Sequence, residues 1–234
     1  MSEISSLDDS LALWSAEPGE RAGRPLLVLL HGYGADENDL FGLVPYLPPE
    51  YVVAAVRAPL APPWPAPGFS WYAIEGLDSR DPEPVTLAAR QLIAWLGEAG
   101  GDAASIGLLG FSQGASVALQ ALRLEPGRFR FVVNLSGYAA PGPLPGDAVL
   151  AESRPPVFWG RGTHDDVIPE FLIAHTTEWL PEHSTLSGRV YPGLTHSVSE
   201  PELADVRVFL EKRLEDATGD GGGGGAAAGE TGTA

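Results

Sequence analysis

The sequence has no cysteine and few basic residues. Of its 234 residues, 14 are Lys or Arg and 31 are Asp or Glu, which gives a formal net charge of −17. Without cysteine there is no disulfide framework, no thiolate metal site and no cysteine nucleophile. Nucleic acids and anionic membranes both attract clustered basic side chains, whereas here Lys212 is the only lysine and the arginines are scattered. We therefore expect no nucleic-acid partner and no stable membrane association.

Long hydrophobic runs are also missing. The longest purely aliphatic runs, such as Leu26–Leu30 and Val52–Val56, are far shorter than the roughly 20 residues that a membrane-spanning helix needs. The first ten residues are polar and acidic, without the basic and apolar regions of a secretory signal. These features predict a soluble cytoplasmic protein.

The end of the chain differs in composition from the rest. Gly219–Ala234 consists almost entirely of Gly, Ala and a few polar residues, which cannot bury a core, so we expect 216–234 to be a disordered tail. Residues 1–215 are sufficient for a single domain with a sizeable core. Two proline-rich segments, Ala58–Gly68 and Pro141–Pro156, are interpreted as surface excursions of that domain rather than linkers.

Within 1–215, short apolar runs alternate with segments of helical periodicity. Strands are predicted at Leu26–Leu30, Val52–Val56, Ser105–Leu109, Phe131–Leu135, Val157–Trp159 and Arg189–Tyr191. Helices are predicted at Asp36–Leu47, around Val85–Leu96, at Ala115–Leu124, at Pro169–Leu180 and after a capping box formed by Ser199 and Glu202. This alternation predicts an α/β fold with a mainly parallel sheet covered by helices on both faces. Functional residues are then expected at the carboxyl ends of the strands.

A G-x-S-x-G motif provides the strongest indication of chemistry. It spans Gly110–Gly114, with a predicted strand before it and a predicted helix after it. This strand–turn–helix setting is typical of a nucleophile elbow, in which the central Ser112 is the attacking residue. The alternative is a glycine-rich turn in which the serine merely caps a helix. Because a serine hydroxyl is a weak nucleophile, the chemistry requires a base and a residue that orients the base.

His196 is the candidate base, because it lies in the loop between the last predicted strand and the final helix. His31 directly follows a strand and is expected to shape the loop there. Asp165 is the candidate orienting acid: it follows a strand and lies between Ser112 and His196 in the chain, the order that elbow-type hydrolases use. Asp166 is its rival.

A metal site formed by His164, Asp165 and Asp166 is a further reading of the same loop. Adjacent residues rarely converge on one centre, and the sequence shows no second cluster of ligands.

The oxyanion of the reaction would need two backbone donors. The N–H of Gln113, at the start of the elbow helix, is one, and the N–H of Tyr33 in the turn His31–Gly34 is the other. Phe69, Trp71 and Tyr72 are expected to line the substrate pocket. An alternative interpretation of the proline-rich segment Ala58–Gly68 is that it is a polyproline ligand for a partner domain.

The motifs resemble those of one branch of the α/β-hydrolases. Residues Leu29–Asp36 (LLHGYGAD), Gly110–Ala115 (GFSQGA), Asp165–Pro169 (DDVIP) and Gly193–Val198 (GLTHSV) are similar to those of bacterial carboxylesterases, lysophospholipases and acyl-protein thioesterases. The resemblance spans about Leu26–Leu214 and implies an α/β-hydrolase fold without a large cap domain. It also favours Asp165 over Asp166. Two positions depart from the pattern: Arg161 stands where members often have His, and Tyr72-Ala73 stands where they often have Phe-Asp.

Together these observations predict a serine hydrolase. We expect it to cleave carboxylic esters of short to medium acyl chains through an acyl-enzyme, with a small-molecule ester or thioester as substrate and no metal or organic cofactor. Lysophospholipase or acyl-protein thioesterase activity is the alternative. A catalytically silent binding protein would normally lack a member of the triad, and a peptidase would normally carry an extra domain. The sequence leaves a homodimer open.

Overall fold

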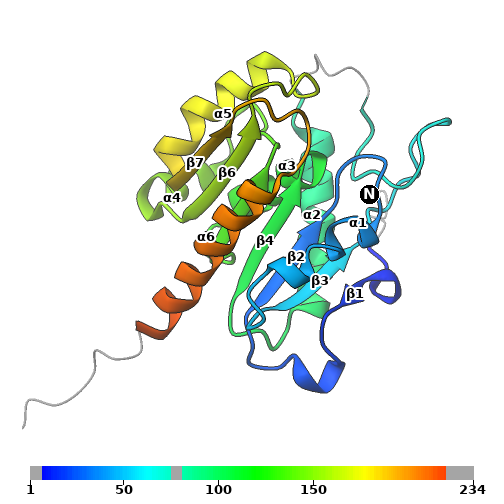
Figure 1. Ribbon diagram of the computed structural model, residues 1–234, viewed down its shortest axis with the longest axis vertical. Helices are drawn as coiled ribbons and strands as arrows, with labels where there is room; N and C mark the ends of the chain where they lie inside the picture. The colour runs from blue at the N-terminus through cyan, green and yellow to red at the C-terminus, as the bar shows by residue number, and fades with distance from the viewer. Residues whose placement is uncertain (1–6, 75–80, 220–234) are drawn as a thin grey trace, which may run out of the picture.

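A computed structural model describes residues 7–74 and 81–219. Its centre is a seven-stranded sheet in the order β1-β3-β2-β4-β5-β6-β7 (Figure 1). All neighbouring strands are parallel except β1, which runs antiparallel to β3. The strands are β1 (Leu13–Trp14), β2 (Leu26–Leu30), β3 (Val52–Val56), β4 (Ile106–Phe111), β5 (Phe131–Leu135), β6 (Pro156–Gly162) and β7 (Thr185–Tyr191).

Within the described residues, six α-helices connect and cover these strands. They are α1 (Glu37–Phe41), α2 (Glu83–Ala99), α3 (Gln113–Leu124), α4 (Pro145–Ser153), α5 (Glu170–His183) and α6 (Glu200–Gly219). Short 3₁₀ helices lie at Asp9–Leu11, Pro18–Glu20 and Val44–Tyr46. Within the described ranges, no inserted domain interrupts the alternation, and no helix is long and apolar enough to cross a membrane. The mainly parallel sheet with helices on both faces is therefore confirmed.

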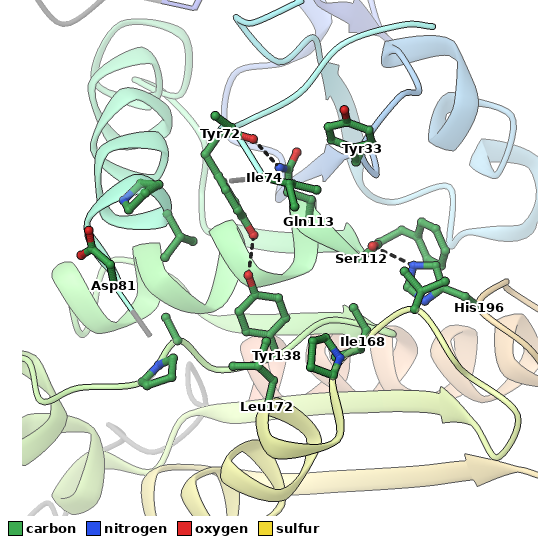
Figure 2. Close-up of a pocket in the computed structure, with 18 residues that line it drawn as sticks. Tyr33, Tyr72, Ile74, Asp81, Ser112, Gln113, Tyr138, Ile168, Leu172 and His196 are labelled. Carbon is green, nitrogen blue, oxygen red and sulfur yellow. Dashed lines mark hydrogen bonds between the residues drawn. The ribbon is translucent and has the colours of Figure 1, made fainter. Parts of the chain in front are cut away.

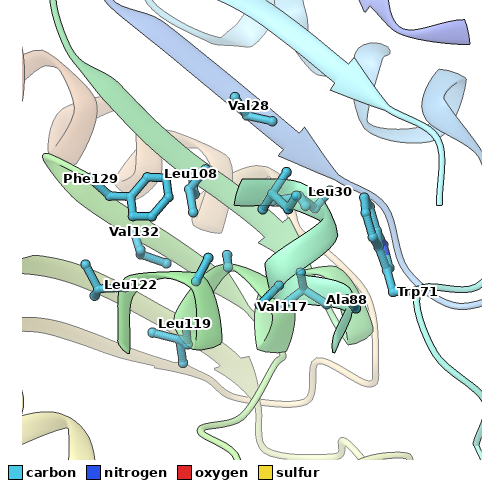
Figure 3. Close-up of a cluster of buried hydrophobic side chains, with 14 of the residues drawn as sticks. Val28, Leu30, Trp71, Ala88, Leu108, Val117, Leu119, Leu122, Phe129 and Val132 are labelled. Atoms are coloured by element: carbon cyan, nitrogen blue, oxygen red, sulfur yellow. The ribbon is translucent and has the colours of Figure 1, made fainter. Parts of the chain in front are cut away.

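Two separate cores lie on the two faces of the sheet. Successive residues of a strand point to opposite faces, so a strand covered on both sides must be apolar throughout. In β2, Val28 and Leu30 join the core formed with α2 and α3 (Figure 3), whereas Leu27 and Leu29 join the core under α1 and α6. This two-sided burial explains the uninterrupted aliphatic runs of the central strands.

The helix predicted at Asp36–Leu47 is shorter than expected. Asp36 begins it as predicted, because its carboxylate accepts the N–H of Asn38 at 2.8 Å. The helix ends at Phe41, and after Gly42 the chain forms the 3₁₀ helix Val44–Tyr46 around Pro45. Proline has no N–H to continue the α-helical pattern, which accounts for the break.

The segment Pro141–Pro156 is not merely a loop, because it contains α4. The buried side chain of Arg123 on α3 fixes this segment, since it pairs with Asp147 and donates to the carbonyls of Ala140 and Gly142. Pro145 occupies the first turn of α4, where a missing N–H costs nothing. The loop that closes one side of the candidate site is thereby attached to α3.

The start of α6 forms only one arm of the predicted capping box. The N–H of Glu202 donates to Ser199 Oγ at 3.3 Å, but the Glu202 carboxylate is fully buried beside Gly160. Neither of its oxygens has a hydrogen-bond partner within the described part of the chain. Burial therefore raises the pKa of Glu202 to about 7. The helix then runs to Gly219, beyond the predicted boundary at residue 215, and 220–234 lie outside the described residues.

Candidate active site

Ser112 lies at the sharp turn between β4 and α3. Its φ of 53° and ψ of −117° belong to a region that residues with a side chain rarely occupy, so the backbone is strained at this position. The flanking glycines make the turn sterically possible. A Cβ at Gly110 would lie 2.4 Å from the Ala115 nitrogen, and one at Gly114 would lie 2.1 Å from the Leu30 carbonyl oxygen. The turn has the geometry of a nucleophile elbow.

His196 and Asp165 meet this serine from two other loops. His196 Nε2 lies 2.8 Å from Ser112 Oγ, and His196 Nδ1 lies 2.8 Å from Asp165 Oδ2 (Figure 2 shows the first of these bonds). The other carboxylate oxygen of Asp165 accepts the N–H groups of Val167 and Ile168 at 3.0 and 3.3 Å. A nearly buried carboxylate is thus fixed by its own loop and faces the imidazole. The three side chains form one hydrogen-bonded chain.

The competing assignments lie outside this chain. Asp166 is exposed to solvent and does not face His196, although it adjoins Asp165. His164 is exposed and contacts the Thr163 hydroxyl. In the described ranges, no group of three or more His, Asp or Glu side chains is arranged to hold a metal ion.

His31 supports the loop that follows β2. Its ring is almost fully buried, with Nδ1 2.7 Å from the Gly32 carbonyl and Nε2 accepting the Ala58 N–H at 3.1 Å. Nδ1 therefore carries the proton and Nε2 is unprotonated, and burial lowers the pKa of this imidazole. His31 shapes the turn, as its position after the strand predicts.

Two backbone N–H groups in the lining of the cavity that contains Ser112 are candidate donors to an oxyanion. Gln113 begins α3, and Tyr33 lies in the turn that His31 supports. Neither the Tyr33 N–H nor the Gln113 N–H donates to any other group among residues 7–74 and 81–219. Unused donors at a helix start and an adjacent turn suit a developing negative charge.

The Gln113 side chain connects the turn between β4 and α3 to residues 70–72. Its Oε1 accepts the Trp71 N–H at 2.8 Å, and its Nε2 donates to the Tyr72 carbonyl at 2.8 Å. The Trp71 indole N–H donates in turn to the His31 carbonyl at 2.9 Å. Both candidate oxyanion donors are thus fixed to the same neighbouring segment.

A cavity of about 460 Å³ opens beside Ser112, within the ~300–1,000 Å³ typical of small-molecule sites. Most of its lining is apolar, and the described lining residues are Tyr33, Tyr72, Ala73, Ile74, Asp81, Pro84, Val85, Phe111, Ser112, Gln113, Tyr138, Ala140, Pro141, Val167, Ile168, Pro169, Leu172 and His196. Sequence reasoning missed most of this wall, because it comes from irregular loops that carry no motif.

Of the three aromatic residues predicted for the pocket, only Tyr72 lines the cavity. Trp71 is 1% exposed and packs behind the wall, with its ring 5.6 Å from that of His31. Phe69 pairs its backbone with Ala35 and Gly34, and its ring lies under the Arg57 guanidinium. Both residues support the wall from outside, and the prediction that they line the pocket is corrected accordingly.

The chain is similar to curated thioesterases and carboxylesterases. The chain is 35% identical over 109 residues to acyl-protein thioesterase 1 of Debaryomyces hansenii, covering 45% of this chain and 47% of that protein. It is 29% identical over 214 residues to a probable carboxylesterase of Oryza sativa subsp. japonica, covering 81% and 88%. The chain thus spans about half the length of the first curated relatives that it matches.

Solved structures show the same fold. A carboxylesterase from Mesorhizobium loti superposes with a TM-score of 0.71 at 23% identity, covering 89% of this chain and 99% of that one. The fold is that of the α/β-hydrolases. The family model described as phospholipase/carboxylesterase matches residues 14–214, nearly all of the described chain. The protein therefore belongs to the phospholipase/carboxylesterase family of hydrolases.

Proposed function

We propose that this protein is a serine hydrolase that cleaves carboxylic esters of short to medium acyl chains. The observation that carries the proposal is the chain of two 2.8 Å hydrogen bonds from Asp165 through His196 to Ser112, at the edge of a largely apolar cavity. A small ester fits this site better than a charged polymer, since the lining is apolar and the protein is strongly acidic. No metal or organic cofactor enters the proposed chemistry.

The proposed reaction has two steps. Ser112 Oγ attacks the ester carbonyl while its proton passes to His196 Nε2, and Asp165 stabilises the imidazolium through Nδ1–H. The carbonyl oxygen becomes an oxyanion held by the N–H groups of Gln113 and Tyr33. His196 gives the proton to the departing alcohol, which leaves Ser112 acylated. Water then attacks the acyl group with the same base, releasing the acid and restoring the serine.

A thioester is the second candidate substrate class, because several relatives carry the name acyl-protein thioesterase 1. The same attack on a thioester carbonyl would release a thiol in place of an alcohol. Lysophospholipase activity uses the same machinery on a larger ester. A cytoplasmic location remains a prediction from the sequence, which leaves a homodimer open.

The direct test compares wild type with Ser112→Ala on p-nitrophenyl esters of increasing acyl length. We expect the substitution to lower kcat by ~10³-fold or more, with an optimum at short to medium chains in the wild type. Equal activity of the two proteins would refute the assignment of Ser112. A parallel series of acyl thioesters shows which leaving group is preferred.

A further inference from the structure

Two tyrosine hydroxyls meet inside the cavity. Tyr72 and Tyr138 approach from opposite sides, Tyr72 from the segment after Ser70 and Tyr138 from the loop after β5, and their oxygens are 2.9 Å apart. In the view of Figure 2 the pair lies between Ser112 and Asp81, and all four residues line the cavity. A group attached to Ser112 that extends into the cavity along this direction meets the two hydroxyls.

The two hydroxyls lie in a cavity whose lining is mostly apolar. The lining includes Val85, Ala140 and Leu172, and it also includes the carboxylate of Asp81. Burial raises the pKa of both phenols, so both remain protonated and neutral at physiological pH. The pair is a neutral polar group in a mostly apolar lining, to which Asp81 adds a carboxylate.

The protons and lone pairs of the two phenol hydroxyls determine which groups the pair can bind. Each phenol has one proton and two acceptor lone pairs, and the mutual bond uses one proton and one lone pair. One proton and three lone pairs are left for other partners, and the Ser116 hydroxyl lies beside both phenols. Ser116 Oγ itself donates to the Ser112 carbonyl at 3.3 Å. The pair therefore offers the cavity more acceptors than donors.

We propose that the Tyr72–Tyr138 pair makes the site select acyl groups that carry a hydrogen-bond donor, such as a hydroxyl, over plain alkanoyl groups of the same length. The inference rests on the proposed function, in which the cavity receives the acyl group. A plain chain displaces water from the two hydroxyls without replacing its hydrogen bonds. A hydroxyacyl chain of matching length restores one of these hydrogen bonds. The hydrogen bond that the plain chain lacks sets the preference for the hydroxylated chain.

The test measures kcat/KM for p-nitrophenyl hexanoate and octanoate beside their ω-hydroxy and β-hydroxy counterparts. We expect wild type to prefer one hydroxylated ester by about ten-fold, the effect of one neutral hydrogen bond. Tyr72→Phe and Tyr138→Phe should each reduce that preference, taken as the ratio of kcat/KM for the hydroxylated and the plain ester, to below about three-fold. Tyr46→Phe makes the same change at a tyrosine outside the cavity and should change nothing.

A second measurement separates this inference from the proposed function. Ser112→Ala is titrated by calorimetry with alkyl methyl ketones that match the esters, with and without the hydroxyl. Tighter binding of the hydroxylated ketone, lost in Tyr72→Phe, supports the inference even without turnover. Equal affinities, or a preference that survives both tyrosine substitutions, overturn it. Wild-type protein that hydrolyses no ester or thioester overturns the proposed function instead.

Discussion

The side-chain oxygen of Gln113 accepts the backbone N–H of Trp71 at 2.8 Å, so the residue after the candidate nucleophile holds the segment that forms one cavity wall. The same side chain donates to the Tyr72 carbonyl at 2.8 Å. The side-chain amide of Gln113 therefore pairs with the backbone of residues 71 and 72 as a strand residue would. It accepts one hydrogen bond and donates the other. Gln113 thereby couples the position of the proposed oxyanion donor to the position of the wall.

Replacing Gln113 should separate these two roles, because every variant keeps the backbone N–H. Gln113→Ala leaves the Trp71 N–H buried and unpaired and leaves the Tyr72 carbonyl with only its bond from Ser70 Oγ, which should cost about 1–3 kcal/mol of unfolding free energy. We expect a raised KM as well. Gln113→Glu keeps the acceptor for Trp71 and should fall between wild type and Gln113→Ala. Thermal melts and ester kinetics check this, and unaltered melting of Gln113→Ala would contradict it.

Asp165 and Asp166 form a natural pair of matched variants. Asp165→Asn removes the carboxylate that faces His196 Nδ1 and should lower kcat by ~10³–10⁴-fold, because the imidazole loses its orientation and the stabilisation of its charged form. Asp166→Asn removes the same charge from the adjacent exposed position and should leave kcat within about two-fold. The comparison uses kcat on a p-nitrophenyl ester. A larger effect at residue 166 would reverse the assignment.

Two glycines test the packing of the elbow. A Cβ at Gly114 would lie 2.1 Å from the Leu30 carbonyl oxygen, so Gly114→Ala should abolish soluble expression or lower the Tm by more than ~10 °C. Gly97 lies within α2 with nothing within 4 Å of the added carbon. Gly97→Ala should raise the Tm by about 2–4 °C through helix propensity. A wild-type melting curve for Gly114→Ala would show that α3 does not press against β2 in this way.

Glu202 predicts a pH dependence of stability. Its folded-state pKa is about 7 against an ordinary value of 4.5, so the folded protein binds this proton more tightly than the unfolded chain does. This contribution is fully present below pH 4.5 and is lost as the pH rises through about 7, with an upper limit of roughly 3 kcal/mol. Glu202→Gln mimics the neutral acid and should be increasingly more stable than wild type as the pH rises from 4.5 to 8.

The control for this effect is Glu200→Gln, in the same turn of α6 but exposed. It should show no such trend in Tm across that range. If Glu202→Gln followed the wild-type curve in parallel, the carboxyl would already be ionised in the folded protein, contrary to its raised pKa.

The central strands were predictable because their environment is uniform. The bounds predicted for β2, β3 and β5 match the structure, since each is a run buried on both faces between polar or turn residues. The edge strand β1 is only two residues long and has no such pattern. The sequence also predicted Ser112, Asp165 and His196 as the candidate catalytic residues from their places after strand ends, and the fold brings these three side chains within hydrogen-bonding distance.

The cavity wall could not be predicted in the same way. Phe69, Trp71 and Tyr72 are all large aromatic residues in one irregular segment, and no periodicity indicates which of them turns inward. The outcome depends on the side chain of Gln113, which pairs with the backbone of Trp71, and on the carbonyl of His31, which receives the indole N–H of Trp71. Tyr138 was missed because its meeting with Tyr72 joins loops that are far apart in the chain.

The attachment of Arg123 has a consequence for how the site works. Arg123 binds the loop around Ala140 to α3, and Gln113 binds residues 71 and 72 to the same helix. Ser112 immediately precedes that helix. Any displacement of α3 would therefore carry the nucleophile and both of these walls together, leaving their relative positions unchanged. We therefore expect the parts of the wall formed by residues 71, 72 and 140 to keep their positions relative to Ser112 when a substrate binds.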